Sequence, residues 1–291
     1  MVEFNNKNMK RTFCNNFIGF YQAVKKCYEK DKILLFRGHC NSIYELTPSL
    51  FRNNNFKKES EYYHKIMIDY PEEFSKKDHL SNLVKLQHFG LPTRLLDFSK
   101  NMLVALYFAC RDGHDVDGDV IVVKTSINKM KHHNSDTVLC LASLPLLNEN
   151  DKNEILKFCK NTRDKTLDKK TYDTNISIHH LYHEIRSEYP TFDFEIVPQD
   201  LLTFQFVACN QDNNRIKAQD GCFAIFGLDK DLSEKELEKC VECHLIIPAK
   251  AKIDILKELD HLGINEKSIY PGLENSMLYL MSKKNNPNNI F

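Results

Sequence analysis

The stretch that organises the chain is LVKLQHFGLPTRLLDFSKNMLVALYFACR, residues 83–111. Its first apolar run stops at Gly90 and Pro92, because glycine accepts a positive φ and proline cannot continue a helix. The next segment, residues 93–98, is short and mostly apolar but carries two charged side chains. The pattern therefore predicts a sharp turn followed by a compact segment with charges inside it.

A core helix is expected directly after this segment. Ser99 or Asn101 can cap it, and residues 102–109 are apolar on every side, which is typical of a buried helix. The two preceding charges, Arg94 and Asp97, then lie between a tight turn and a core helix. An unpaired buried charge is very costly, so these side chains must be paired or used.

Composition limits the classes of function. The chain has 291 residues, with 40 Lys and Arg against 40 Asp and Glu, so bulk charge gives no argument for nucleic-acid binding. No run is long and apolar enough to span a bilayer, and the first residues lack the apolar segment of a signal peptide. Ten scattered cysteines are expected to be mostly reduced and buried. We therefore expect a cytoplasmic protein with no membrane segment.

The rest of the chain alternates between predicted helices and short strands. Helices are expected at residues 12–30, 56–74, 177–187, 252–262 and 271–281. Strands are expected at residues 33–36, 119–124, 201–209, 222–228 and 244–247. Residues 126–175 form an irregular insertion with one helix at 153–159. The fold class that follows is α+β, a mixed or antiparallel sheet flanked by helices, in one domain over residues 1–291 with its core at about 33–280.

Four sequence blocks resemble the FRG domain family, named for Phe-Arg-Gly. They are FRGH at residues 36–39 with YELTPSLFR at 44–52, LQHFGLPTRLLD at 86–97 with ALYFA at 105–109, Arg215 with QDGCF at 219–223, and IYPGLE at 269–274. The resemblance runs from about residue 33 to 280. It implies an architecture more than a chemistry, so the chemistry is argued from individual residues.

Arg37 and Gly38 form the first candidate site. Arg37 ends an apolar strand, where its guanidinium offers a planar fork for phosphate or carboxylate. Gly38 beside it leaves room for a ligand to approach the backbone. The alternative is an arginine that pairs with a structural carboxylate, such as Asp97.

Thr93, Arg94 and Asp97 form the second candidate site. Arg94 and Asp97 lie three apart, the Asp97 carboxylate can pair locally with Arg37 or Arg52, and a structural role is favoured for Asp97. The Thr93 hydroxyl can reach a ligand, although a turn-stabilising threonine after a proline is more common. We therefore expect Arg37, Arg94 and Asp97 to converge in one pocket.

Gln219 and Glu274 are the remaining polar candidates. Gln219 precedes a strand, where its amide can bond a ribose or an amide ligand, or tie down its own loop. Glu274 lies in the first turn of the last predicted helix, where the helix dipole alone explains a carboxylate. As a functional group, it would stabilise positive charge on a sugar carbon.

The arrangement also resembles, distantly, the ADP-ribosyltransferases. That resemblance implies NAD as substrate, with Arg37 binding the dinucleotide and Thr93 or Tyr107 at the second position. Glu274 would be the catalytic carboxylate, supported by Gln219, because Gln219-Asp220-Gly221 departs from the pattern by offering no Glu. A macromolecular target and a role as a bacterial effector or phage-defence toxin would follow. The alternative is a non-catalytic module that recognises a nucleotide or a phosphate group.

Two other motifs predict neither a metal nor haem. Cys240-Val241-Glu242-Cys243-His244 has the spelling of a haem attachment site, but it runs directly into a predicted strand and has no second cysteine pair for zinc. His179, His180 and His183 can place two imidazoles one helical turn apart, but the sequence is not the His-Glu-x-x-His zinc signature. A surface or partly buried histidine cluster is the better interpretation.

Overall fold

The computed structural model describes residues 10–52, 55–74, 78–162, 174–193, 196–208 and 214–283. The strands are β1 (Arg11–Phe13), β2 (Lys32–His39), β3 (Leu95–Ser99), β4 (Gly118–Ser126), β5 (Met130–His132), β6 (Gln205–Ala208), β7 (Gly221–Ile225) and β8 (Val241–Ile247). The first helices are α1 (Phe17–Lys25), α2 (Glu59–Asp69), α3 (His79–His88), α4 (Met102–Cys110), α5 (Asp136–Ser143) and α6 (Glu149–Asn161). The later helices are α8 (Ile176–Glu188), α9 (Pro198–Leu202), α10 (Asn214–Gln219), α11 (Lys230–Glu238), α12 (Lys252–His261), α13 (Glu266–Ile269) and α14 (Leu273–Lys283).

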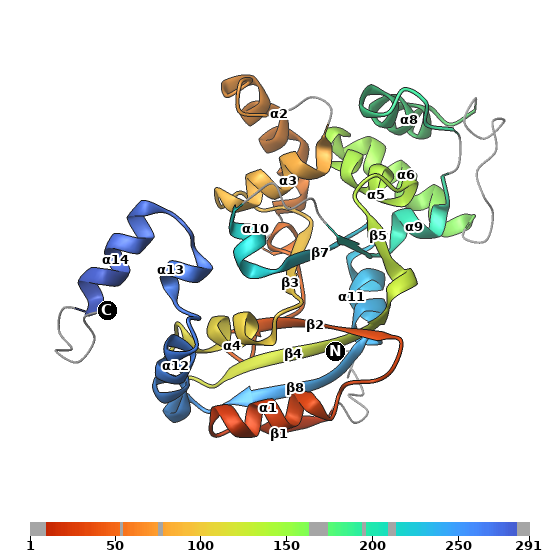
Figure 1. The fold of residues 1–291 in the computed structure, drawn as a ribbon. Helices are drawn as coiled ribbons and strands as arrows, with labels where there is room; N and C mark the ends of the chain where they lie inside the picture. Colours follow the sequence, from red (N-terminus) through yellow and green to blue (C-terminus); the bar gives the residue numbers. More distant parts are fainter. Residues whose placement is uncertain are drawn as a thin grey trace.

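One mixed sheet runs through the molecule, in the order β1-β8-β4-β2-β3-β7-β6-β5. Most neighbouring pairs are antiparallel, whereas β1–β8 and β5–β6, at the two edges, are parallel. β2 pairs with β4 over its whole length but with β3 at one position alone, Phe36 opposite Ser99. β3 turns steeply away from β2 beyond this point, so the sheet opens at its centre (Figure 1). The expected α+β class is confirmed.

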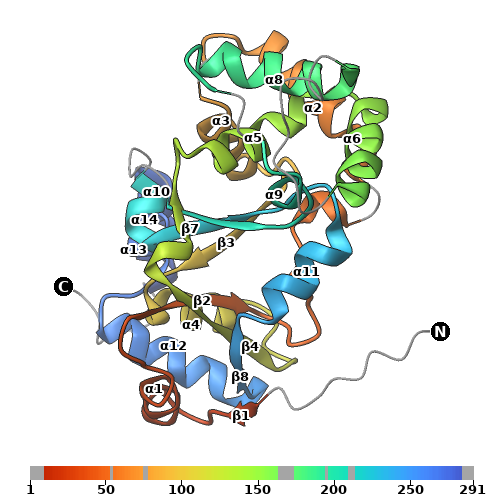
Figure 2. The ribbon, with the colours of Figure 1, turned by 90° about the vertical axis from the view of Figure 1, so that its right-hand side faces the viewer.

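Helices cover one face of this sheet in two separate groups. α1, α4 and α12 pack on β2, β4 and β8, and α3, α5, α6 and α8 pack around β3, β6 and β7. The two groups lie at opposite ends of the molecule in both views (Figures 1 and 2). A third apolar cluster, with Leu35, Phe98 and Phe226, lies on the other face beneath α11. The gap between the two helix groups falls where β2 and β3 separate.

α4 confirms the helix predicted inside residues 83–111. The Asn101 side chain caps it by accepting from the Leu103 N–H at 2.9 Å, and Gly113, at φ 59°, follows its end. Its backbone lies directly on β2, because a Cβ built on Gly38 would be 1.9 Å from the Ala105 carbonyl oxygen. Gly38 thus has a packing role that the sequence interpretation did not include.

The prediction of an irregular segment at residues 126–175 is wrong for its described part. It holds β5, α5 and α6, although residues 163–173 lie outside the described chain. α5 is buried over most of its length because it carries Val138, Leu139 and Leu141 into the core. The helix expected at 153–159 is confirmed as part of α6. No helix of the described chain is long and apolar enough to cross a membrane.

Candidate functional site

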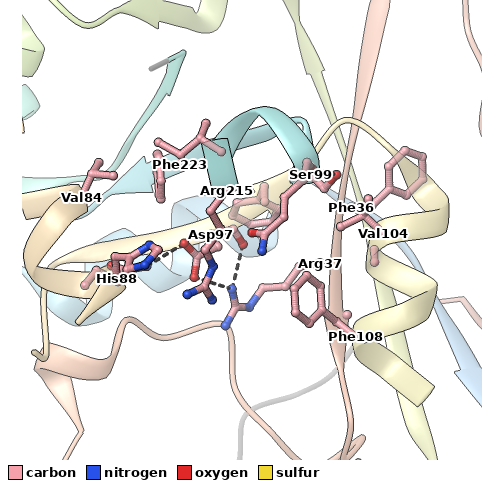
Figure 3. A pocket seen from close by; sticks show the side chains of 16 residues that line it. Phe36, Arg37, Val84, His88, Asp97, Ser99, Val104, Phe108, Arg215 and Phe223 are labelled. Carbon is pink, nitrogen blue, oxygen red and sulfur yellow. Dashed lines mark hydrogen bonds and ion pairs between the residues drawn. The ribbon is translucent and has the colours of Figure 1, made fainter. Parts of the chain in front are cut away.

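A cavity of about 250 Å³ lies where β2 and β3 separate, between the two helix groups. Its lining comes from elements far apart in the sequence: β2, α3, β3, α4, α10 and β7. Charged side chains lie near the middle of the lining, with apolar side chains on either side of them (Figure 3). The lining residues are Phe36, Arg37, Gly38, Val84, Gln87, His88, Asp97, Phe98, Ser99, Val104, Ala105, Phe108, Arg215, Ile216, Gln219 and Phe223.

Arg37 enters this cavity from the end of β2. Its Nη1 donates to the Asp97 carbonyl oxygen at 2.7 Å and lies 3.8 Å from the Asp97 carboxylate. Its Nε donates to His39 Nε2 at 2.8 Å. The arginine therefore spans the opening where the β2–β3 ladder stops. Burial lowers the pKa of Arg37, yet a guanidinium stays charged in proteins.

Asp97 is held by a short chain of hydrogen bonds from α3. The buried Thr93 hydroxyl donates to Gln87 Oε1, and Gln87 Nε2 donates to Asp97 Oδ1 at 2.6 Å. The Asp97 side chain remains 59% exposed. Desolvation raises its pKa, whereas Arg37 and Arg215 act to lower it. Thr93 thus orients Asp97 through Gln87, and its hydroxyl is already hydrogen-bonded within the protein.

A second guanidinium, that of Arg215, lines the cavity from α10. Its carbon Cζ lies 4.7 Å from the centre of the Tyr270 ring, and the Arg111 guanidinium lies 5.0 Å from the same ring. Arg111 Nη1 also donates to the Tyr270 hydroxyl. Gln219 anchors α10 by donating from Nε2 to the Ile269 carbonyl oxygen at 3.2 Å. The segment before α14 therefore fixes one wall of the cavity.

Arg94 does not join Arg37 and Asp97, so the predicted three-way convergence is wrong. Arg94 lies at the bend before β3, whereas Asp97 lies within β3, and the two side chains have different surroundings. Arg94 is 2% exposed and makes two bonds to Glu59, at 2.8 and 2.6 Å. Burial alone would raise the pKa of Glu59, but Arg94 and Lys152 together lower it. Arg94 is a structural residue that joins β3 to α2.

Tyr107 and Glu274 also lie away from the cavity. Tyr107 is buried in α4 and lines a separate depression beside α12, with Asn265 and Glu266. Burial raises its pKa to about 12. Glu274 is exposed in the first turn of α14 and is not among the residues that line the cavity. The structure therefore brings together Arg37, Gly38, Asp97 and Gln219, but neither Tyr107 nor Glu274.

The cysteine and histidine motifs have ordinary structural surroundings. Cys243 is buried on β8 with its sulfur 3.5 Å from that of Cys27, and His244, on the other face of the strand, bonds Asp119. His180 bonds Asp151 at 2.9 Å. Within the described ranges, no group of three His, Cys, Asp or Glu side chains is arranged to hold a metal ion.

Comparison with known proteins identifies one domain. Residues 32–118 match the FRG domain family, and the chain therefore contains an FRG domain. This segment supplies Arg37, Gln87 and Asp97, whereas Arg215 and Gln219 come from beyond it. No curated protein and no solved structure gives a significant match to the chain.

Proposed function

We propose that the cavity binds a nucleotide, with NAD as the first ligand to test. The observation that carries this proposal is the convergence of Arg37, Arg215 and Asp97 on one cavity with apolar walls (Figure 3). Guanidinium groups bind phosphate through charge-assisted hydrogen bonds, and a carboxylate accepts from ribose hydroxyls. Apolar walls accept a flat ring. A nucleotide carries all three chemical groups.

The size of the cavity limits how such a ligand binds. About 250 Å³ is below the roughly 300–1,000 Å³ of typical small-molecule sites. The cavity therefore accommodates one part of a dinucleotide, and the remainder would lie along its mouth. The apolar side chains of Phe108 and Val104 suit the ring, with the phosphates towards the two arginines.

The chemistry we propose for NAD is transfer of ADP-ribose to a macromolecule, with Asp97 as the carboxylate. The bond from the nicotinamide nitrogen to ribose C1′ breaks, nicotinamide leaves, and C1′ bonds to a nucleophile of the target, which loses a proton. Positive charge develops on the sugar during this step, and a fixed carboxylate stabilises it. Asp97 suits this role better than Glu274, because it lines the cavity and Gln87 holds one of its oxygens. Such a transferase would act as an effector or a phage-defence toxin.

A non-catalytic recognition module is the second candidate. It is favoured by the charges around Asp97, because Arg37 and Arg215 both act on this carboxylate. A carboxylate that two guanidinium groups already neutralise stabilises a sugar cation less effectively. In that case the same cavity would bind a nucleotide or phosphate group without turnover.

Calorimetry with NAD, followed by mass spectrometry for released nicotinamide, separates the two candidates. Asp97→Asn keeps the shape of the side chain and removes its charge. A transferase should bind NAD in both forms but release nicotinamide at least about 100-fold more slowly in the variant. Binding without release by the wild type supports the recognition module. No saturable binding of NAD, ADP-ribose or pyrophosphate at millimolar concentration overturns both proposals.

A further inference from the structure

The guanidinium of Arg37 is bonded to protein at two of its three nitrogens. Its Nε bonds His39 and its Nη1 bonds the Asp97 carbonyl oxygen. Among the described residues, Nη2 has no hydrogen-bond partner. Figure 3 shows the group between Asp97 and Phe108. Both N–H groups of Nη2 and the second N–H of Nη1 therefore remain for the oxygens of a ligand.

His39 fixes the orientation of the Arg37 guanidinium. It lies two residues after Arg37 on β2, so both side chains are on the same face of the strand. His39 is 4% exposed, and its Nε2 accepts the Arg37 Nε–H at 2.8 Å. An imidazole nitrogen accepts a hydrogen bond only without its proton, so His39 is neutral with its hydrogen on Nδ1. Burial, with the charges of Arg37 and Arg52, lowers its pKa to about 3.

A buried carboxylate lies on the same face of the sheet as this imidazole. Asp119 is directly opposite His39 in the β2–β4 ladder, so the two side chains share a face. Among the described residues, neither His39 Nδ1 nor Asp119 Oδ1 has a hydrogen-bond partner, and both atoms are buried. Asp119 Oδ2 is bonded to His244 Nδ1 at 2.6 Å. The Nδ1 hydrogen therefore lies on the same face of the sheet as Asp119, and the Tyr44 backbone acts on the ring to raise its pKa.

We propose that His39 is the positioning residue of Arg37, and that it directs the remaining N–H groups of the guanidinium to a phosphate oxyanion in the cavity. The ligand in this statement rests on the function proposed above, whereas the orientation of Arg37 is a property of the free protein. Without the bond to His39, Arg37 keeps its charge but loses the fixed direction that a two-point contact to phosphate needs.

Two amide substitutions separate positioning from structure. His39→Gln puts an oxygen acceptor near the place of Nε2, whereas His39→Asn puts it near Nδ1, where Arg37 does not reach. ¹⁵N NMR of the free protein should show His39 as the neutral Nδ1–H tautomer from pH 5 to 8. The Arg37 Nε–H should exchange slowly with solvent in the wild type and in His39→Gln, and rapidly in His39→Asn.

The binding arm uses NAD and inorganic pyrophosphate as probes in calorimetry, with thermal unfolding as the control. His39→Gln should bind within threefold of the wild type, and His39→Asn about tenfold more weakly, the loss expected for one charge-assisted bond. An Nε2–H tautomer, or equal Arg37 exchange in both variants, overturns the positioning role. If the wild type binds neither probe, the proposed function fails, and the NMR result alone decides the orientation of Arg37.

Discussion

Replacing Arg94 should cost far more stability than replacing Arg37, although both belong to motif blocks. Arg94 and Glu59 are 2% and 5% exposed, and Arg94 also donates to the Phe226 carbonyl oxygen at 2.8 Å. Removing one partner of a buried pair costs roughly 3–5 kcal/mol, because the other charge stays buried. Lys152 still bonds Glu59 at 2.6 Å, so the loss of stability in Arg94→Met should be near the lower end of this range, ~3 kcal/mol.

A variant that removes the whole buried cluster tests the reason for this loss. Glu59→Leu, Arg94→Met and Lys152→Met together leave no buried charge behind, so most of the stability should return, to within ~1–2 kcal/mol of the wild type. Urea unfolding followed by far-ultraviolet circular dichroism is the suitable assay, because the sequence has no Trp.

Arg37→Met is the control for the same change at the cavity. Its partner Asp97 is 59% exposed and becomes hydrated, whereas the buried His39 loses the donor to its Nε2, so the cost should be about 1–2 kcal/mol. A loss below ~1 kcal/mol for Arg94→Met, or equal losses for the two arginines, would refute the division into structural and cavity residues.

Three further outcomes are expected. Burial raises the pKa of Glu188 from its usual 4.5 to about 7, so the folded form holds a proton that the unfolded chain has lost, and stability falls as pH rises between these values. The free energy of unfolding of Glu188→Gln, relative to that of the wild type, should therefore rise by roughly 2–3 kcal/mol from pH 5 to pH 8 in urea titrations. A difference between the two proteins that does not change with pH would contradict this. Gly38→Ala should lower stability by at least ~2 kcal/mol, because the new Cβ meets the α4 backbone, and an unchanged thermal midpoint would show that α4 moves freely. Tyr270→Leu should weaken NAD binding about threefold by releasing Arg215, while Tyr270→Phe keeps the ring and the affinity, so equal affinities in calorimetry would remove Tyr270 from the site.

The parts of the site that the sequence predicted are those set by local chain geometry. Arg37 was found because a charge at the end of an apolar strand is unusual, and Asp97 because it precedes a core helix. α5 was missed because its apolar run lies within a polar region and packs against segments distant in sequence. Glu59 was not recognised as the partner of Arg94, 35 positions away, because nothing local indicates that contact.

The long-range contacts of Gln219 and Arg215 could not be predicted from the sequence. The sequence offered Gln219 as a strand-end amide, and the structure adds that it anchors α10 through the Ile269 carbonyl oxygen. Arg215 belonged to a recognised block, but its role depends on Tyr270, 55 positions further on. Glu274 is predicted as the catalytic carboxylate because residues 219–221 offer no Glu, and that reason does not determine where α14 lies. Long-range packing, and not local propensity, decides which charges share the cavity.

The central claim is that Arg37 binds the phosphate of a nucleotide in this cavity. Its most direct test is calorimetry of NAD with the wild type, Arg37→Lys and the control Arg186→Lys, which makes the same change on α8 at the far end of the molecule. Lysine keeps the charge but loses the planar fork, so Arg37→Lys should bind about tenfold more weakly, from a loss of roughly 1.5–3 kcal/mol. Arg186→Lys should match the wild type. Equal affinity in all three proteins, or no binding by the wild type at millimolar NAD, would contradict the claim.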